Sequence, residues 1–157
     1  MFSSSLGLLL LGLFGASPQK VDHVRLGQWS IERTQDRFTG AVRCKATRSA
    51  VTLTGDLAVI TLGARHDVSQ SLYRLDDGPA QPIGLIPEND VYHARFITDA
   101  PYDNPSDGII AMPASTLRTH QVLWIRIDAH HAPVRVLISG LAAAEAQENA
   151  LGCSQNP

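Results

Sequence analysis

Two adjacent histidines, His130 and His131, come nearest to metal chemistry by residue type and spacing, and Asp128 lies just before them. Imidazole nitrogens and a carboxylate are accepted zinc ligands, provided that folding brings enough of them together. Neighbouring side chains on an extended backbone point in opposite directions, which favours a solvated turn here. We therefore expect no metal or other cofactor, and keep Asp128, His130 and His131 as candidate ligands. The histidines that folding could add are His23, His66, His93 and His120.

Residues 100–107 (APYDNPSD) form the second polar cluster, and their prolines, aspartates and asparagine predict a loop. Carboxylates suit calcium, but the spacing does not match the twelve-residue calcium loop, so a structural turn is favoured. A loop braced by prolines can also be presented rigidly to a partner. The candidate partner-binding residues are therefore Tyr102, Asp103 and Asp107.

Nucleophilic catalysis has less support. Ser139 and Gly140 lack the preceding glycine of a G-x-S-x-G nucleophile elbow, and glycine-rich phosphate loops are absent from the sequence. Ser106 and Ser115 have no base beside them in the chain. We assign no catalytic residue, and an enzyme is the less favoured class of protein.

The length and composition of the chain limit the class of protein to which these residues can belong. A chain of 157 residues favours one domain, and 44% hydrophobic with 18% charged residues is typical of an ordered globular protein. The net charge of −2 argues against nucleic acid as a partner, since such proteins carry a basic surface.

The chain opens with an apolar run, residues 6–14 (LGLLLLGLF), followed by small residues up to Ser17. The run is shorter than the roughly 20 residues that span a bilayer, and it resembles the hydrophobic region of a secretory signal. It lacks a basic residue before it, and Pro18 follows the most obvious cleavage position; the alternative is a buried N-terminal strand or helix. We expect a signal peptide over residues 1–17, a single β-rich domain over 18–157, no later membrane span, and a periplasmic or secreted protein.

Export determines how the two cysteines, Cys44 and Cys153, are interpreted. An oxidising compartment makes a disulfide between them the default, whereas the cytosol would leave two free buried thiols. The bridge would join the first third of the chain to its end.

Strand patterns dominate the rest of the chain. Two β-branched runs within residues 51–63 flank Gly55-Asp56 and predict a tight hairpin, and alternation over residues 121–128 and 133–139 predicts a second pair. In residues 41–47, Val42, Cys44 and Ala46 share one face. We expect a mainly β fold, an antiparallel β-sandwich or a small barrel-like meander. Further strands are expected over residues 28–33, 73–76, 91–98 and 109–112.

The period changes at residues 140–151 (GLAAAEAQENAL), whose alanine-rich composition predicts a C-terminal α-helix. Ser139 is the expected N-cap and Gly152 the expected end. We expect the alanine face to lie against the sheet, and Glu145 and Glu148 to lie on a solvated face.

With these elements in place, the chain resembles small exported bacterial proteins of the invasion-associated locus B type. The resemblance rests on Trp29, on residues 73–78 (YRLDDG) and on residues 137–144 (LISGLAAA) leading to Cys153. It departs from that family in having a single cysteine pair and no inward cysteine in the central strands. It implies an exported β-rich fold with a role outside the cytoplasm, and it carries over no catalytic residue.

Three hypotheses for function follow. The favoured one is an exported, periplasmic, non-enzymatic binding or structural module of unknown ligand, with another envelope protein as an expected partner. The second is an inhibitor-type module that docks a loop, residues 100–108, into a partner enzyme. The third is a small metal-dependent or serine hydrolase, which requires several polar groups to converge in a pocket.

Overall fold

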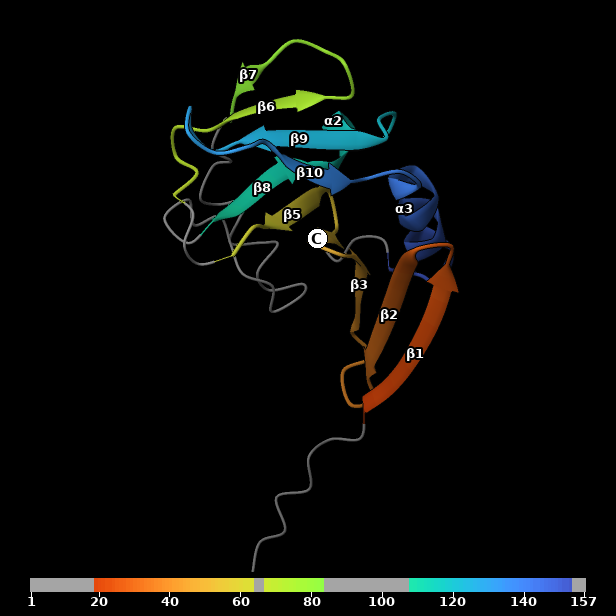
Figure 1. The fold of residues 1–157 in the computed structure, drawn as a ribbon. Helices are drawn as coiled ribbons and strands as arrows, with labels where there is room; N and C mark the ends of the chain where they lie inside the picture. Colours follow the sequence, from red (N-terminus) through yellow and green to blue (C-terminus); the bar gives the residue numbers. More distant parts are fainter. Residues whose placement is uncertain (1–18, 64–66, 84–107, 154–157) are drawn as a thin grey trace, which may run out of the picture.

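The computed structural model describes residues 19–63, 67–83 and 108–153 as two antiparallel sheets and a C-terminal helix (Figure 1). This confirms the mainly β, sandwich-like fold expected from the sequence. The six-stranded sheet has the order β1-β2-β3-β4-β5-β8, with β1 Gln19–Leu26, β2 Trp29–Asp36, β3 Val42–Arg48, β4 Val51–Thr54, β5 Leu57–Thr61 and β8 Ile109–Pro113. The four-stranded sheet has the order β10-β9-β6-β7, with β10 Val134–Leu137, β9 Val122–Arg126, β6 Leu72–Leu75 and β7 Gln81–Pro82.

The two hairpins with the clearest alternation form as predicted. Thr54 pairs with Leu57 across a turn in which Gly55 has a φ of 55°, a left-handed conformation that glycine adopts without strain. In the second pair, Val136 of β10 lies opposite Leu123 of β9, and both are buried. The sequence pattern therefore predicted the turn of the first hairpin and the inward face of the second.

The hydrophobic core lies between the two sheets. Leu53, Ile60 and Ile110 come from the six-stranded sheet and meet Leu123 and Ile125 from the four-stranded sheet in one buried cluster. Figure 1 shows the four-stranded sheet above the β5–β8 end of the larger sheet, while β1, β2 and β3 extend away from it. We call these three strands the arm. The core between the two sheets does not extend to the far end of the arm. The arm therefore needs another layer to pack against.

Helix α3, Leu141–Ala150, supplies that layer, because it packs beside the arm (Figure 1). It ends as predicted: Gly152 has a φ of 74°, its N–H donates to Asn149 O, and the Cys153 N–H donates to Glu148 O at 3.0 Å. These two bonds form a Schellman motif, which satisfies carbonyl groups left over at the helix end.

The start of α3 differs from the prediction. Gly140, with a φ of 79°, is the N-cap, and no side chain caps the helix. The hydroxyl of Ser139 instead accepts a hydrogen bond from Arg48 Nη1 at 2.7 Å, and its carbonyl accepts one from Trp29 Nε1 at 3.0 Å. The prediction that Ser139 is the N-cap was wrong, because Arg48 and Trp29 of the six-stranded sheet occupy its polar groups.

The inward face of α3 also differs from the expected alanine face. Leu141, Ala144 and Glu148 are its buried residues, and the other four alanines of the helix are exposed. The prediction of a solvated Glu148 was wrong, since its exposure is 5%. Glu145 is mostly covered because Arg118 pairs with it, with Nε lying 2.6 Å from Oε2.

Three elements were not predicted from the sequence: β1, the two-residue strand β7 and the short helix α2, Ala114–Leu117. The expected strand over residues 91–98 and the expected signal peptide over 1–17 lie outside the described residues. Within the described part of the chain, no helix is long and apolar enough to cross a membrane.

Burial raises the pKa of the Glu148 carboxyl to about 7, the negative charge of Glu145 adds to this, and a hydrogen bond from the Ala46 backbone works against it. Among the described residues, Glu148 Oε1 has no hydrogen-bond partner. The folded protein therefore favours the protonated acid.

We predict that the free energy of unfolding falls as pH rises from 5 to 8. A pKa raised on folding contributes stability that is complete below the unfolded pKa and is lost as pH passes the folded pKa. The loss from this group should reach about 3 kcal/mol. Urea unfolding at several pH values measures it. Glu148→Gln should remove most of the slope between pH 5 and 8, and an unchanged slope would contradict the assignment.

Candidate functional site

The two cysteines are joined, as the sequence analysis expected. Cys44 and Cys153 form a disulfide with a Cα–Cα distance of 5.5 Å across a sequence separation of 109. Cys44 is buried on the inner face of β3, where Ala46 lies on the same face. The bridge therefore ties the arm to Cys153, three residues beyond the end of α3.

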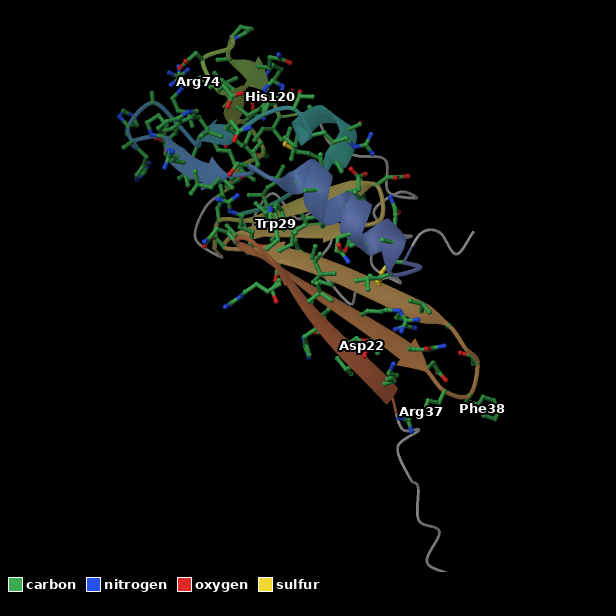
Figure 2. All side chains as sticks on the ribbon, turned by 90° about the vertical axis from the view of Figure 1, so that its right-hand side faces the viewer. Asp22, Trp29, Arg37, Phe38, Arg74 and His120 are labelled. Carbon is green, nitrogen blue, oxygen red and sulfur yellow. A yellow bond between two sulfur atoms is a disulfide. The ribbon has the colours of Figure 1, made fainter. Side chains whose placement is uncertain are left out.

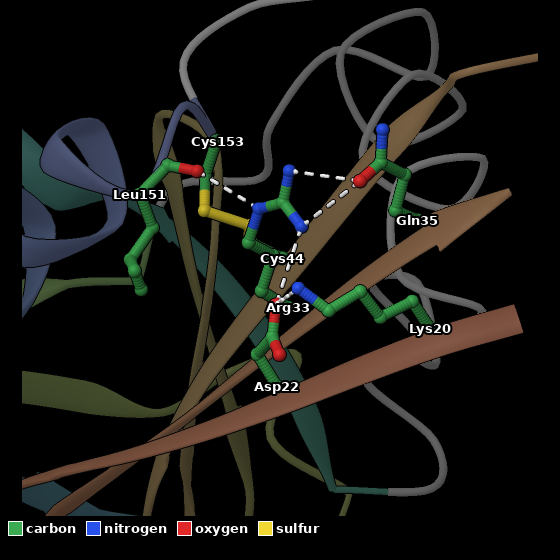
Figure 3. Close-up of polar contacts among 7 residues, drawn as sticks. All are labelled: Lys20, Asp22, Arg33, Gln35, Cys44, Leu151 and Cys153. Atoms are coloured by element: carbon green, nitrogen blue, oxygen red, sulfur yellow. Dashed lines mark hydrogen bonds and ion pairs between the residues drawn. A yellow bond between two sulfur atoms is a disulfide. The ribbon is translucent and has the colours of Figure 1, made fainter. Parts of the chain in front are cut away.

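Arg33 reinforces this junction from β2 (Figure 3). The register places Asp22, Arg33 and Cys44 opposite one another in a row across the arm. Arg33 Nε donates to Leu151 O at 2.9 Å, and its Nη1 lies 3.4 Å from Asp22 Oδ2. Only 17% of the Arg33 side chain is exposed. We call the Cys44–Cys153 bridge and the Arg33–Leu151 hydrogen bond together the helix clasp.

The candidate metal ligands lie together in the turn between β9 and β10. Asp128 Oδ1 accepts hydrogen bonds from the backbone N–H groups of His130 and His131 at 2.7 and 2.9 Å, and Oδ2 lies 2.7 Å from His131 Nδ1. The hydrogen bond to His131 and the two backbone N–H groups lower the pKa of Asp128 to about 2. The geometry is that of a carboxylate fixing a turn. In the part of the chain that the structure describes, no three or more histidine, cysteine, aspartate or glutamate side chains are placed to hold a metal ion together.

The candidate partner contacts Tyr102, Asp103 and Asp107 lie outside the described residues. A different exposed turn is described at the tip of the arm, where Asp36 Oδ1 accepts hydrogen bonds from the N–H groups of Phe38 and Thr39. Phe38 is 91% exposed there (Figure 2). A single exposed apolar side chain is common and does not define a binding surface by itself.

Asp76 and His120 form a pair that the sequence analysis did not identify. His120 Nδ1 lies 2.9 Å from Asp76 Oδ2, while Asp76 Oδ1 accepts hydrogen bonds from the N–H groups of Gln121 and Val122. The contact with His120 and these two N–H groups lower the pKa of Asp76. A carboxylate beside a histidine is the orienting half of a catalytic triad. Here the Asp76 carboxylate also holds the start of β9, and this structural role is sufficient to explain the pair.

The outer face of the four-stranded sheet carries the most distinctive surface. Leu123 and Ile125 point into the core, so Trp124 between them points outward. Arg74 of β6 and Arg135 of β10 lie directly opposite Trp124 on either side. Their guanidinium carbons lie 5.4 and 6.0 Å from the centre of the indole. We call Arg74, Trp124 and Arg135 the arginine–tryptophan stack.

Both contacts of the stack have the geometry of a cation–π interaction, which is worth about 0.5–1 kcal/mol at an exposed site. Both arginines are exposed and Trp124 is half buried. Sequence reasoning missed the stack because its members come from three strands that only the register brings together. The signal in the chain is limited to an outward tryptophan in β9 and an outward arginine in each of β6 and β10.

Comparisons with protein-family models, with curated proteins and with solved structures found no match. The resemblance to the invasion-associated locus B type therefore stays an expectation.

We predict that Cys44→Ala/Cys153→Ala lowers the free energy of unfolding by about 4–5 kcal/mol, because a closed loop of this length restricts the unfolded chain. Chemical denaturation followed by circular dichroism measures the change. Arg33→Leu in the bridged protein should cost about 1 kcal/mol, the typical net value of a hydrogen bond. A bridged and an unbridged protein with the same unfolding midpoint would show that the disulfide does not support the fold.

Proposed function

We propose that this protein is an exported, disulfide-bonded, non-enzymatic binding module that works in the periplasm or outside the cell. The observation that carries the proposal is the bridge between Cys44 and Cys153. Structural disulfides form and persist in oxidising compartments and are rare in the cytosol. A bridge that holds the last helix on the arm fits a protein folded after export.

The apolar run of residues 6–14 gives independent support for export. It has the length and the following small residues of a cleaved leader. The two features are separate in sequence and in chemistry, because one concerns a hydrophobic segment and the other a pair of thiols. Each would be unusual in a cytosolic protein.

The polar side chains of the described residues favour binding over catalysis. The Asp128–His131 and Asp76–His120 pairs each use their carboxylate to hold backbone N–H groups of a turn. A hydrolase requires a base, a nucleophile or metal, and charge stabilisation around one point. The arginine–tryptophan stack, by contrast, offers charge and an aromatic ring on an open sheet face, an arrangement suited to contact with a partner.

We predict that the full sequence, produced in a bacterial host, yields a mature periplasmic or secreted protein that begins near residue 18 and contains no free thiol. Intact mass before and after reduction, with alkylation of any thiols, measures both properties. The matched control is Leu9→Arg/Leu10→Arg, which places charges in the apolar run. This variant should keep its N-terminus, remain in the cytoplasm and react at both cysteines without reduction.

Unprocessed wild-type protein in the cytoplasm with two alkylated cysteines would overturn the proposal. Processing and export with both thiols still free would remove its main support, because the bridge would then have no role in the mature molecule.

A further inference from the structure

We propose that the outer face of the four-stranded sheet, centred on the arginine–tryptophan stack, binds the carboxylates of a short acidic segment on a partner protein. This inference rests on the proposed function, since it names the class of partner for the binding module. It is carried by the juxtaposition of three arginines and one tryptophan on one side of the sheet.

Arg126 is the third arginine of this face. It lies two residues after Trp124 in β9 and therefore points to the same side. The ion pairs found among the described residues involve none of Arg74, Arg126 and Arg135. Three exposed arginines thus share one face of the sheet, two of them over one indole, on a protein whose net charge is −2. The positive charge of this face is a local feature and not a consequence of overall composition.

Contact with the indole prepares Arg74 and Arg135 for a carboxylate. An arginine that lies over an indole uses the flat face of its guanidinium, so the N–H groups at its edge stay available. Those N–H groups match the two oxygens of a carboxylate and form paired, charge-assisted hydrogen bonds. Contact with the ring also restricts the rotamers of the side chain before binding, which reduces the entropy lost on association.

The distance between the strands that carry Arg74 and Arg135 favours a short peptide segment over a single small anion. Arg74 and Arg135 are on strands two places apart, which is about 10 Å for strand spacings near 4.8 Å. Because Trp124 lies between them, the two arginines suit two separate carboxylates better than one. An extended chain rises about 3.3 Å per residue, so acidic side chains a few residues apart could meet them together.

A carboxylate at each end of this face, along the strand direction, limits the length of its positively charged surface. Asp76 lies beside Val122, at the start of β9, since its N–H donates to Val122 O. Asp128 lies two residues beyond Arg126, past the other end of the strand. Their hydrogen bonds lower both pKa values, so both groups are charged at neutral pH. A long polyanion running along the strands would meet negative charge at both ends.

The aromatic ring completes the argument for a protein partner. Tryptophan and arginine are enriched at the centres of protein–protein interfaces and among the residues that dominate their energy. The net charge of −2 disfavours a nucleic acid, since proteins that bind one carry an extensive basic surface. We therefore favour an acidic protein segment with an apolar residue that covers the edge of Trp124.

The test uses the mature, bridged protein and a short fluorescein-labelled peptide of alternating glutamate and serine with one central leucine, measured by fluorescence anisotropy. A copy with glutamine in place of glutamate is the uncharged control. Arg74→Gln/Arg135→Gln should weaken binding of the acidic peptide about tenfold or more, as two charge-assisted pairs are lost. Arg25→Gln/Arg43→Gln, which removes two exposed arginines of the other sheet, should change it less than about twofold.

A further variant separates specific contact from general attraction. Arg74→Lys/Arg135→Lys keeps both charges but loses the planar pair of donors, so binding should fall severalfold. If both lysine and glutamine variants bind like the wild type, or if the two glutamine double variants lose affinity equally, the proposal is overturned.

Two other probes cover the competing partners, namely a labelled single-stranded oligonucleotide and a sulfated oligosaccharide. Tighter binding of either one, with the same dependence on Arg74 and Arg135, would replace the acidic protein segment by a polyanion. Absence of binding by all probes would overturn the inference. Neither outcome affects the export and thiol measurements. Failure of the binding test therefore leaves the proposed function intact, and failure of the proposed function is detected by the export and thiol measurements alone.

Discussion

The closure between Cys44 and Cys153 is the constraint on which the packing of α3 against the arm depends. Helix α3 has only ten residues and buries three side chains, one of which is a carboxylic acid. A helix of this length is marginal in water and needs tertiary contacts to persist. The bridge holds the end of α3 on β3, and Arg33 takes up the carbonyl of Leu151 beside it. With α3 in place, the inner face of the arm gains the second layer that the core between the two sheets does not provide.

This arrangement also separates two kinds of chemistry within the molecule. The helix clasp lies on the arm, whereas the arginine–tryptophan stack lies on the outer face of the other sheet; Figure 2 shows Asp22 on the arm and Arg74 near the opposite end. The four-stranded sheet buries Leu123 and Ile125 on one side, which leaves its other side free for polar and aromatic residues. Because strand alternation assigns these two sides independently, the composition of the outer face places little demand on the core.

Local patterns predicted the fold where the physical cause is local. The turn at Gly55 and the alternation around Leu123 and Val136 depend on residues that are neighbours in the sequence, and both hairpins were predicted correctly. Strand β1 (QKVDHVRL) was missed because its inner face is only half buried, so it lacks a clear apolar alternation. Glu148 was assigned to solvent because nothing near it in sequence reveals that β3 lies against it. The stack was missed for a similar reason, since it requires the register of three strands.

The buried acid and the bridge act on the same helix in opposite ways. Ionised Glu148 between α3 and β3 disfavours docking of the helix, because burial and the charge of Glu145 both oppose its negative form. The bridge lies outside this balance, since a covalent bond keeps the end of α3 beside Cys44 whatever the charge of Glu148. An unbridged chain would have to hold the helix by packing alone, and above neutral pH that packing would include a charged group. The disulfide is therefore most important under the conditions in which thiolate chemistry also proceeds fastest, since both the ionisation of Glu148 and that of a thiol increase as pH rises.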